Sequence, residues 1–474
     1  MKETRLINVL IFLSIFVSSI TFFREPFEGY FHYLIFLILF PPFIGNFGFP
    51  RQAMLLLVVP LFVGILEILM GNNTWALFFK IFLGVMLSAS FYYYVIQYYE
   101  MDTEKMFRLY LKGAVIVCYI GLVQFVSYII HFSPGYNYGW LFNKWAIVPG
   151  GFGFRVNSIF SEASQFAIVI SPACFVAIHN LIPGTNSFVL TRFQSIAVLV
   201  TLLLTTSTTG YIGLFIILFL FILNYGQIIY FLIGIGFTIL GANVLYNNVP
   251  EFKTRVDTSI GLWITGEFST ENINSSSFVL FNNYHIALEN FKGNFITGTG
   301  LGSHPIAFDK YSLTNETGYL DIHFNKADGN SLLIRLISET GLIGIIFMIV
   351  FIRRNFIRRN PYDNENPDWI ISNAILVLIV LYLLRQGNYF LNGFPFFMWL
   401  YYYVRKENER KLLEAEVDAE IGEDEMEEKE TNESEETDEP EEIPKSRKRI
   451  GESNDSDESD DTDEDEQWAT KSPI

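Results

Sequence analysis

Apolar stretches of about 17 to 25 residues recur through the first 405 positions of this chain, separated by shorter polar segments. An apolar stretch of ~20 residues is long enough to cross the hydrocarbon core of a membrane as a helix. We place spans at about 6–23, 31–45, 53–70, 75–97, 107–130, 163–182, 194–206, 210–225, 228–247, 340–352, 369–385 and 388–404. The pattern therefore predicts an all-α polytopic membrane protein with about 12 transmembrane helices.

Lys and Arg accumulate in every second connection between the spans, and this predicts the orientation of the chain, because cytoplasmic loops retain positive charge. With the N-terminus inside, the cytoplasmic connections receive Arg51, Lys105, Arg108, Lys112, Arg192, Arg353, Arg354, Arg358, Arg359, Arg405 and Lys406. Two long segments are then extracytoplasmic, at 131–162 and at 248–340. Loops of this length usually have a function. Both termini are expected to be cytoplasmic.

The net charge of −18 belongs to the C-terminal segment and not to the membrane body. From Glu407 onward the chain has 29 acidic and 8 basic residues, whereas the preceding part is nearly neutral. Such a segment cannot bury enough apolar surface to offset the entropy that it loses on ordering. We therefore expect a transmembrane domain at 1–405 and a disordered acidic cytoplasmic tail at 406–474. The tail is either a solvating extension or a docking segment for a basic partner.

The first candidate for chemistry lies just before the sixth span. Arg155 and Glu162 flank the segment 156–161 and would share one face if the segment were helical. One interpretation is an interfacial Arg followed by a Glu at a helix start, which the helix dipole favours. The other is a functional pair on the outer side of the membrane.

A second candidate ends the large loop and leads directly into a span. Asp328, Asn330 or Ser331 could cap the helix that starts there. Arg335 and Glu339 follow at the i and i+4 spacing that places them on one helix face. They form either a local ion pair or a site in which the Arg335 guanidinium binds phosphate bidentately near the lipid headgroups.

Earlier in the large loop, Gly298, Gly300 and Gly302 lie within five residues, followed closely by His304. Glycines at this density allow the backbone to approach an anion. The segment is not a dinucleotide fingerprint, because no strand-turn-helix unit surrounds it. His304 is either a general base or an ordinary polar loop residue.

Three further ionisable residues lie in or near the predicted spans. Glu67 and Lys80 lie about one turn inside the outward ends of consecutive helices, where they would pair with each other or snorkel. Arg385 ends a span at the short outward hairpin before the last one. It is either an interfacial anchor or a third cation that faces the outer side.

The sequence predicts neither a metal nor a cofactor. Cys118 and Cys174 fall in different apolar stretches, and no group of His, Cys or carboxylate residues has metal-ligand spacing. No Walker motif or nucleophile elbow is present. A reaction at the outer surface would therefore use a substrate that is already activated.

With these motifs in place, the chain resembles the O-antigen polymerase and ligase superfamily, in particular its Wzy-type polysaccharide polymerases. The resemblance rests on Arg155-Val156-Asn157-Ser158-Ile159-Phe160-Ser161-Glu162, on Thr206-Ser207-Thr208-Thr209-Gly210, on Gly298-Thr299-Gly300, and on the run from Asn330 to Gly344. The large outward loop also lies where the family carries its own. The first four spans and the tail add no motif.

The resemblance implies a glycosyltransferase without a metal, in the plasma membrane. Members transfer a glycan from undecaprenyl diphosphate to an acceptor hydroxyl on the outer face. In a polymerase the acceptor is another lipid-linked repeat unit of an O-antigen, capsule or exopolysaccharide. The partners would be that glycan, membrane lipids, and a flippase and chain-length regulator of the same pathway, with no nucleic acid.

The resemblance also suggests roles for the candidate residues. Arg155, Arg335 and Arg385 would hold the diphosphate and stabilise its charge as it leaves. Glu162, Asp328, Glu339 or His304 would take the proton of the acceptor hydroxyl. Asn330 and the three glycines would complete the substrate site.

Two departures from the family pattern qualify these roles. Ligases tend to have a His-Asn pair where this chain has Gly329-Asn330, which leaves the base unassigned and favours a polymerase. Many relatives also have Arg where this chain has Thr208. The alternatives are an O-antigen ligase and a transporter or flippase of lipid-linked glycans, although a transporter usually has broken helices in matching halves.

Overall fold

The computed structural model describes residues 2–17, 20–23, 28–150, 153–185, 187–226, 250–265, 275–314, 325–360 and 366–436, with a few further positions between 232 and 248. The chain divides into two units, Met1–Leu412 and Leu413–Ile474. The apolar helices of the described part of the chain lie in the first unit.

Within these described ranges, seven helices are long and apolar enough to cross a membrane. They are α3 (Arg51–Leu69), α4 (Trp75–Tyr98), α5 (Thr103–Ile129), α7 (Ala163–Leu181), α9 (Thr208–Tyr225), α15 (Leu332–Asn355) and α16 (Asp368–Arg385). Three shorter apolar helices accompany them: α1 (Lys2–Phe16), α2 (Phe31–Phe47) and α8 (Arg192–Leu204). The chain is therefore a helical multi-pass membrane protein, and this part of the prediction is confirmed.

Three of the predicted spans do not appear as such. The helix of the span at 6–23 ends at Phe16, and Thr21 pairs with Tyr30 in an isolated β-bridge. The span at 228–247 lies mostly outside the described residues. The one at 388–404 begins in a turn, continues through the 3-10 helix η2 (Leu391–Gly393), and becomes helical only at α17 (Phe394–Glu436). The total of twelve spans and the extracytoplasmic position of 248–340 stay predictions.

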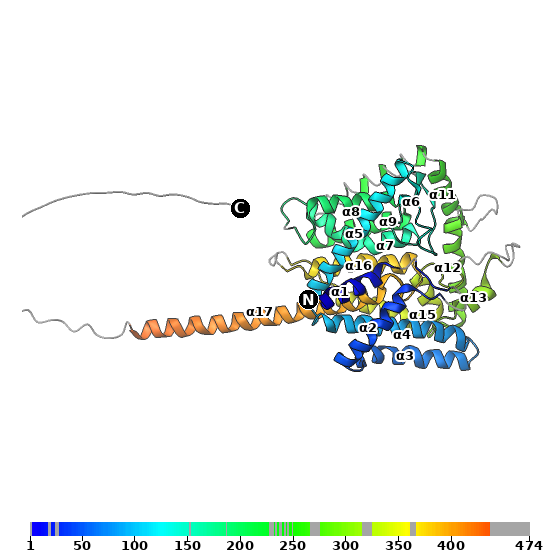
Figure 1. Ribbon diagram of the computed structural model, residues 1–474. Helices are drawn as coiled ribbons and strands as arrows, with labels where there is room; N and C mark the ends of the chain where they lie inside the picture. Colours follow the sequence, from blue (N-terminus) through cyan, green and yellow to red (C-terminus); the bar gives the residue numbers. More distant parts are fainter. Residues whose placement is uncertain are drawn as a thin grey trace, which may run out of the picture. The chain divides into compact units, whose positions relative to one another are not determined.

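Short elements gather at one end of the first unit. They are α6 (Ser133–Tyr136), the antiparallel strands β1 (Pro149–Gly150) and β2 (Gly153–Phe154), α11 (Pro250–Ile260), the π-helix η1 (Gly261–Thr265), α12 (Ser275–Gly293) and α13 (His304–Tyr311). Figure 1 shows α11, α12 and α13 together at this end, with the N-terminus toward the other. We call it the loop end, and it includes the turn at 386–390.

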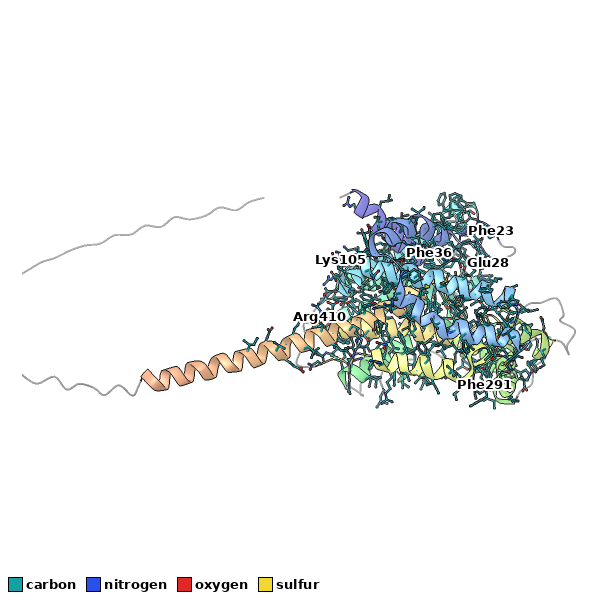
Figure 2. The ribbon with its side chains drawn as sticks, turned by 90° about the horizontal axis from the view of Figure 1, so that it is seen from below. Phe23, Glu28, Phe36, Lys105, Phe291 and Arg410 are labelled. Atoms are coloured by element: carbon teal, nitrogen blue, oxygen red, sulfur yellow. The ribbon has the colours of Figure 1, made fainter. Side chains whose placement is uncertain are left out.

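The opposite end carries basic residues, and we call it the basic end. Figure 2 shows Lys105 and Arg410 toward it, with Phe23, Glu28 and Phe291 toward the loop end. Hydrogen bonds join its segments: the Arg358 Nε donates to Leu223 O at 3.1 Å, and the Lys411 Nζ donates to the buried Asp368 carboxylate at 2.9 Å. Lys105 and Arg358, two of the residues predicted to be cytoplasmic, therefore lie toward the same end of the bundle.

Helices α7 and α16 form the centre of the bundle and pack against each other, and both are largely buried. Aromatic rings fill much of the remaining interior, as where Phe36 stacks on Phe91 with ring centroids 4.1 Å apart. Close packing of this kind holds membrane helices together, because lipid offers no hydrophobic driving force between them. Helix α3, by contrast, buries few of its apolar side chains.

Helix α15 is broken at Gly341, which has φ 57° and ψ −149°. The carbonyls of Ser338 and Glu339 accept hydrogen bonds from Thr299 N and Gly300 N instead of from their own helix. In return, Leu342 N and Ile343 N donate to the carbonyls of Phe295 and Ile296. These four bonds satisfy the backbone groups that the break releases, as a membrane interior requires.

The segment from Arg155 to Glu162 is not helical, so the expected common face of these two residues does not exist. The Asn157 side chain donates to Phe160 O at 2.8 Å and accepts from Gln124 of α5 at 3.1 Å. Ser158, at φ 49°, donates its hydroxyl to Val117 O. These side chains offer the backbone better partners than a helix would, because Asn and Ser compete for backbone groups.

The second unit is described only as the end of α17, up to Glu436. Helix α17 therefore continues into the first part of the predicted tail, and the disorder of the tail stays a prediction. This stretch is rich in Glu, which favours helix even where no apolar face is buried. Residues 437–474 lie outside the described part of the chain.

Candidate functional site

A buried ion pair lies at the start of α15. Ser331 caps the helix, as predicted, by accepting from Ile334 N, and its hydroxyl donates to Leu383 O at 2.6 Å. One turn later, the Arg335 Nε and NH2 groups donate to one Glu339 oxygen at 2.9 and 2.8 Å. Their side chains are 2% and 0% exposed. The predicted local pair exists, but it is enclosed and not at the surface.

The turn after α16 completes the surroundings of this pair. The Arg335 NH1 group donates to Gly387 O at 2.9 Å, and the Tyr389 hydroxyl donates to the second Glu339 oxygen at 2.8 Å. The Tyr389 ring also lies 4.4 Å from the guanidinium carbon. Every charged oxygen and all three guanidinium nitrogens therefore have a partner, which is the condition under which a buried ion pair is tolerated. Direct binding of phosphate by Arg335 would require these bonds to break.

His304, the first residue of α13, is fully buried beside the ion pair. Its Nε2 lies 2.9 Å from Asn283 Oδ1, and the Asn283 amide nitrogen donates to Val279 O. The amide is thus oriented so that Nε2 must carry the proton, which leaves Nδ1 as an acceptor. Burial, together with the charge of Arg335, lowers the pKa of His304 to about 3. The imidazole is therefore neutral at physiological pH and a weak base.

The turn before α15 packs directly on these groups. A Cβ added to Gly329 would lie 3.2 Å from His304 Nε2 and 3.3 Å from Arg335 Cγ. Asp328 accepts hydrogen bonds from the side chain of Asn325 and the amide of Asn330. Asn330 itself adopts φ 59°. His304 therefore lies directly against Gly329 of the turn before α15.

The glycine-rich turn has a structural role that the sequence did not indicate. A Cβ on Gly298 would lie 2.5 Å from the backbone of Glu339, and one on Gly302 would lie 2.4 Å from Leu77 O. The amides of Gly298 and Gly300 already donate to the carbonyls of Asn294 and Glu339. Because these two amides are in use, an anion cradle at this turn stays a prediction that the hydrogen bonds do not favour.

Glu67 takes part in the same packing and not in a pair with Lys80. It is buried in α3 and accepts from the Asn72 amide at 2.8 Å and the Thr297 hydroxyl at 2.9 Å. Lys80 is exposed and acts electrostatically on Glu28. Glu67 therefore fixes the glycine turn to α3.

Arg385 and Glu162 provide the more accessible charges. Arg385 is half-buried at the end of α16, and its NH2 group donates to the neutral Ser276 hydroxyl at 2.9 Å. Glu162 is exposed at the start of α7, accepts from the Ser164 hydroxyl, and interacts electrostatically with Arg385. A cation and a carboxylate that are distant in the sequence thus lie within electrostatic reach of each other at the loop end.

Arg155 lies at the junction between α8 and α9. Its Nε donates to Thr205 O at 3.4 Å, and its charge acts on the hydroxyl of Tyr211. The other end of α9, at Leu223 and Asn224, is bonded to Arg358 and Arg359 at the basic end. Arg155 therefore lies toward the loop end.

The contacts link seven of the predicted site residues into one neighbourhood around the 386–390 turn: Glu162, His304, Asp328, Asn330, Arg335, Glu339 and Arg385. Tyr389 and Asn283 belong to it as well. Sequence reasoning missed both, because nothing in their local pattern separates them from ordinary loop and helix residues. Within the described ranges, no three His, Cys, Asp or Glu side chains are grouped so as to hold a metal ion.

Comparison with known proteins adds no family assignment, since no protein-family model and no curated protein matches the chain.

Proposed function

We propose that this protein is a Wzy-type polysaccharide polymerase that joins undecaprenyl-diphosphate-linked repeat units on the outer face of the plasma membrane. The proposal is carried by one observation: Arg385, half-buried at the loop end, lies within electrostatic reach of the exposed Glu162. A glycosyl transfer from a lipid diphosphate needs a cation for the leaving group and an acceptor for one proton.

In the proposed reaction, the acceptor sugar hydroxyl attacks the anomeric carbon of the donor. Its oxygen forms the new C–O bond, and its proton passes to the Glu162 carboxylate. The bond between the anomeric carbon and the diphosphate oxygen breaks, and its electron pair leaves with undecaprenyl diphosphate. Arg385 and Arg155 stabilise the charge that develops on this leaving group.

The buried groups have a different role in this proposal. Arg335 and Glu339 satisfy each other and hold the 386–390 turn that precedes the last helix. His304, with its lowered pKa, remains neutral and supports the turn at Gly329. Among the four candidate bases, Glu162 is the exposed carboxylate beside an accessible cation, and for this reason we assign the proton to it.

A deletion strain complemented with variants tests the proposal, with the surface glycan examined as a ladder on a gel. Glu162→Gln and Arg385→Gln should leave single repeat units and no long polymer. Glu28→Gln is a matched control, because Glu28 also lies at the loop end but forms a surface pair with Lys144. Long polymer in both test variants, at normal protein level, would contradict the roles proposed for Glu162 and Arg385.

The alternatives leave other products in the same strain. Loss of an O-antigen ligase would leave polymer that is complete but still lipid-linked. Loss of a transporter or flippase would leave repeat units on the inner leaflet; the break in α15 favours this alternative, since broken helices occur at transport sites. The break is filled by loop backbone in this chain, however, and so forms part of the packing.

A further inference from the structure

At the junction between α8 and α9, one helix ends and the next begins, and two side-chain hydroxyls there lack hydrogen-bond partners among the described residues. Helix α8 ends at Leu204, Thr206 adopts φ 42°, and α9 begins after Ser207. The first N–H groups of a helix have no acceptor within it and carry partial positive charge. Helix α9 has 18 residues, so its dipole is fully developed.

Ser207 occupies the N-cap position of α9 but does not act as a cap. The side chain of an N-cap serine normally accepts from an N–H in the first turn. Ser207 makes no such bond, although it is 1% exposed, and its Oγ has no partner within the described part of the chain. Buried hydroxyls are nearly always paired, so this one indicates a missing partner.

Thr206 presents a second hydroxyl of the same kind. Its Oγ1 is buried and is likewise without a hydrogen-bond partner among the described residues. A Cβ added to Gly150 would lie 2.7 Å from this Oγ1 and 2.5 Å from Arg155 Cγ. Thr206 and Arg155 therefore meet at Gly150, where a larger residue would separate them.

Arg155 adds the positive charge. Its guanidinium approaches the carbonyl of Thr205, the residue before the two unpaired hydroxyls. A guanidinium, two hydroxyl donors and the N–H groups of a helix start are the groups that bind a tetrahedral oxyanion.

We propose that the N-terminus of α9, with Thr206, Ser207 and Arg155, binds a phosphate group. The geometry alone points to the phosphate. Its identification as part of a lipid-linked diphosphate donor, and not a phospholipid headgroup, rests on the proposed function. The bound phosphate supplies the partner that the hydroxyls of Thr206 and Ser207 lack.

The experiment measures binding by calorimetry to the full-length protein in a phosphate-free detergent. Three probes are used: inorganic diphosphate, farnesyl diphosphate and phosphatidylglycerol. Ser207→Ala should weaken binding about tenfold, since it removes one hydrogen bond to a charged group, and Arg155→Gln should weaken it further. Ser195→Ala is the matched control, because Ser195 in α8 is also buried and its hydroxyl has no partner among the described residues, but it lies twelve residues before Ser207.

The three probes distinguish the sources of the phosphate. Tighter binding of farnesyl diphosphate than of the other two supports a lipid diphosphate, whereas equal binding of phosphatidylglycerol supports a headgroup. The phosphate site is overturned if wild-type protein binds none of the probes, or if Ser207→Ala and Arg155→Gln bind as wild type does. It is also overturned if Ser207→Ala lowers the unfolding temperature of the free protein but leaves probe binding unchanged, since Ser207 would then act as a helix cap alone.

The outcome for the site is separable from the outcome for the function. If the deletion strain keeps its long polymer while Ser207→Ala still weakens probe binding, the polymerase proposal fails and the phosphate site stands. If polymer is lost in the deletion strain but probe binding is unchanged by both substitutions, the phosphate site fails and the polymerase proposal stands.

Discussion

Arg335 and Glu339 form an ion pair within one turn of α15, with both side chains almost completely removed from solvent. The pair also holds Tyr389 and the carbonyl of Gly387, so it joins α15 to the turn that follows α16. Loss of either partner would leave a buried charge without compensation, and this is more costly than loss of the pair as a whole.

We therefore expect Arg335→Ala to destabilise the protein by about 3–5 kcal/mol, the range typical of a broken buried pair. The double variant Arg335→Met, Glu339→Leu should recover much of this loss, because it leaves no unpaired charge. Thermal unfolding in detergent measures both. Arg335→Met and Glu339→Leu are also measured singly. If their two losses of stability add up to the loss in the double variant, the pair is not coupled as its geometry indicates.

Gly341 allows α15 to break, and replacement by Ala should be strongly destabilising. Its φ of 57° is unfavourable for alanine by about 1–2 kcal/mol. The new Cβ would also lie 2.6 Å from Gly298 N, a backbone atom that cannot move aside easily. Overpacking adds a further cost of about 1–3 kcal/mol.

Two glycines serve as controls for this substitution. Gly184 has φ 83° with no atom near the added Cβ, so Gly184→Ala tests backbone strain alone. Gly45→Ala has neither strain nor a close atom. The unfolding temperature should fall most for Gly341→Ala, less for Gly184→Ala, and least for Gly45→Ala; a different order would contradict the role given to the break.

His304 should make the stability of the protein depend on pH. Its pKa is about 3 in the folded protein and about 6.5 when unfolded. Between these values the unfolded chain binds the proton and the folded protein does not, so stability is full above pH 6.5 and falls as the pH is lowered toward 3. The contribution of this one group has a slope of at most about 1.4 kcal/mol per pH unit.

Unfolding measured between pH 7 and pH 4 checks this expectation. His304→Gln retains a hydrogen-bond donor toward Asn283 but cannot titrate, so its stability should change less across the same range. An identical pH dependence in the variant and the wild type would show that other groups are responsible.

The position of a C-terminal truncation should decide whether it is tolerated. Lys411 pairs with Asp368, whose side chain is 0% exposed. Deletion from Glu407 removes Lys411 and leaves that carboxylate unpaired, whereas deletion from Leu413 keeps the pair. Because Lys411 is 35% exposed and partly screened, the cost should be a fraction of the about 3–5 kcal/mol of a fully buried pair.

Unfolding temperatures of the two truncated proteins measure the difference directly. Asp368→Asn should restore stability to the shorter protein, because it removes the unpaired charge. Equal stability of both truncations would mean that the Lys411 bond contributes little.

The sequence predicted those features that depend on local period and composition. Apolar stretches located the long helices, and the i, i+4 spacing identified the Arg335–Glu339 pair and the cap at Ser331. It could not show that this pair is buried, because burial depends on Tyr389 and Gly387, which follow a different helix. Nor could it show that 155–162 is irregular, since the decisive partner is Gln124 on α5.

The glycine-rich turn shows the same limit in another form. Three glycines within five residues suggested an anion site, yet each is required for close approach of backbone to α15, α3 or α4. The sequence did not show this structural role of the glycines. The turn packs against the break at Gly341, which lies about forty positions further on. Conversely, the unpaired hydroxyl of Ser207 is a property of three-dimensional packing and has no sequence signal.

The four backbone hydrogen bonds at the α15 break also affect how helices α12 and α13 can move. They fasten residues 295–300, which connect α12 to α13, to the middle of a membrane helix. Helices α12 and α13 are also bonded to each other, since His304 Nε2 lies 2.9 Å from Asn283 Oδ1. A rearrangement of α12 would therefore carry α13 with it, and the two helices would turn together about the edge that the α15 break holds in place.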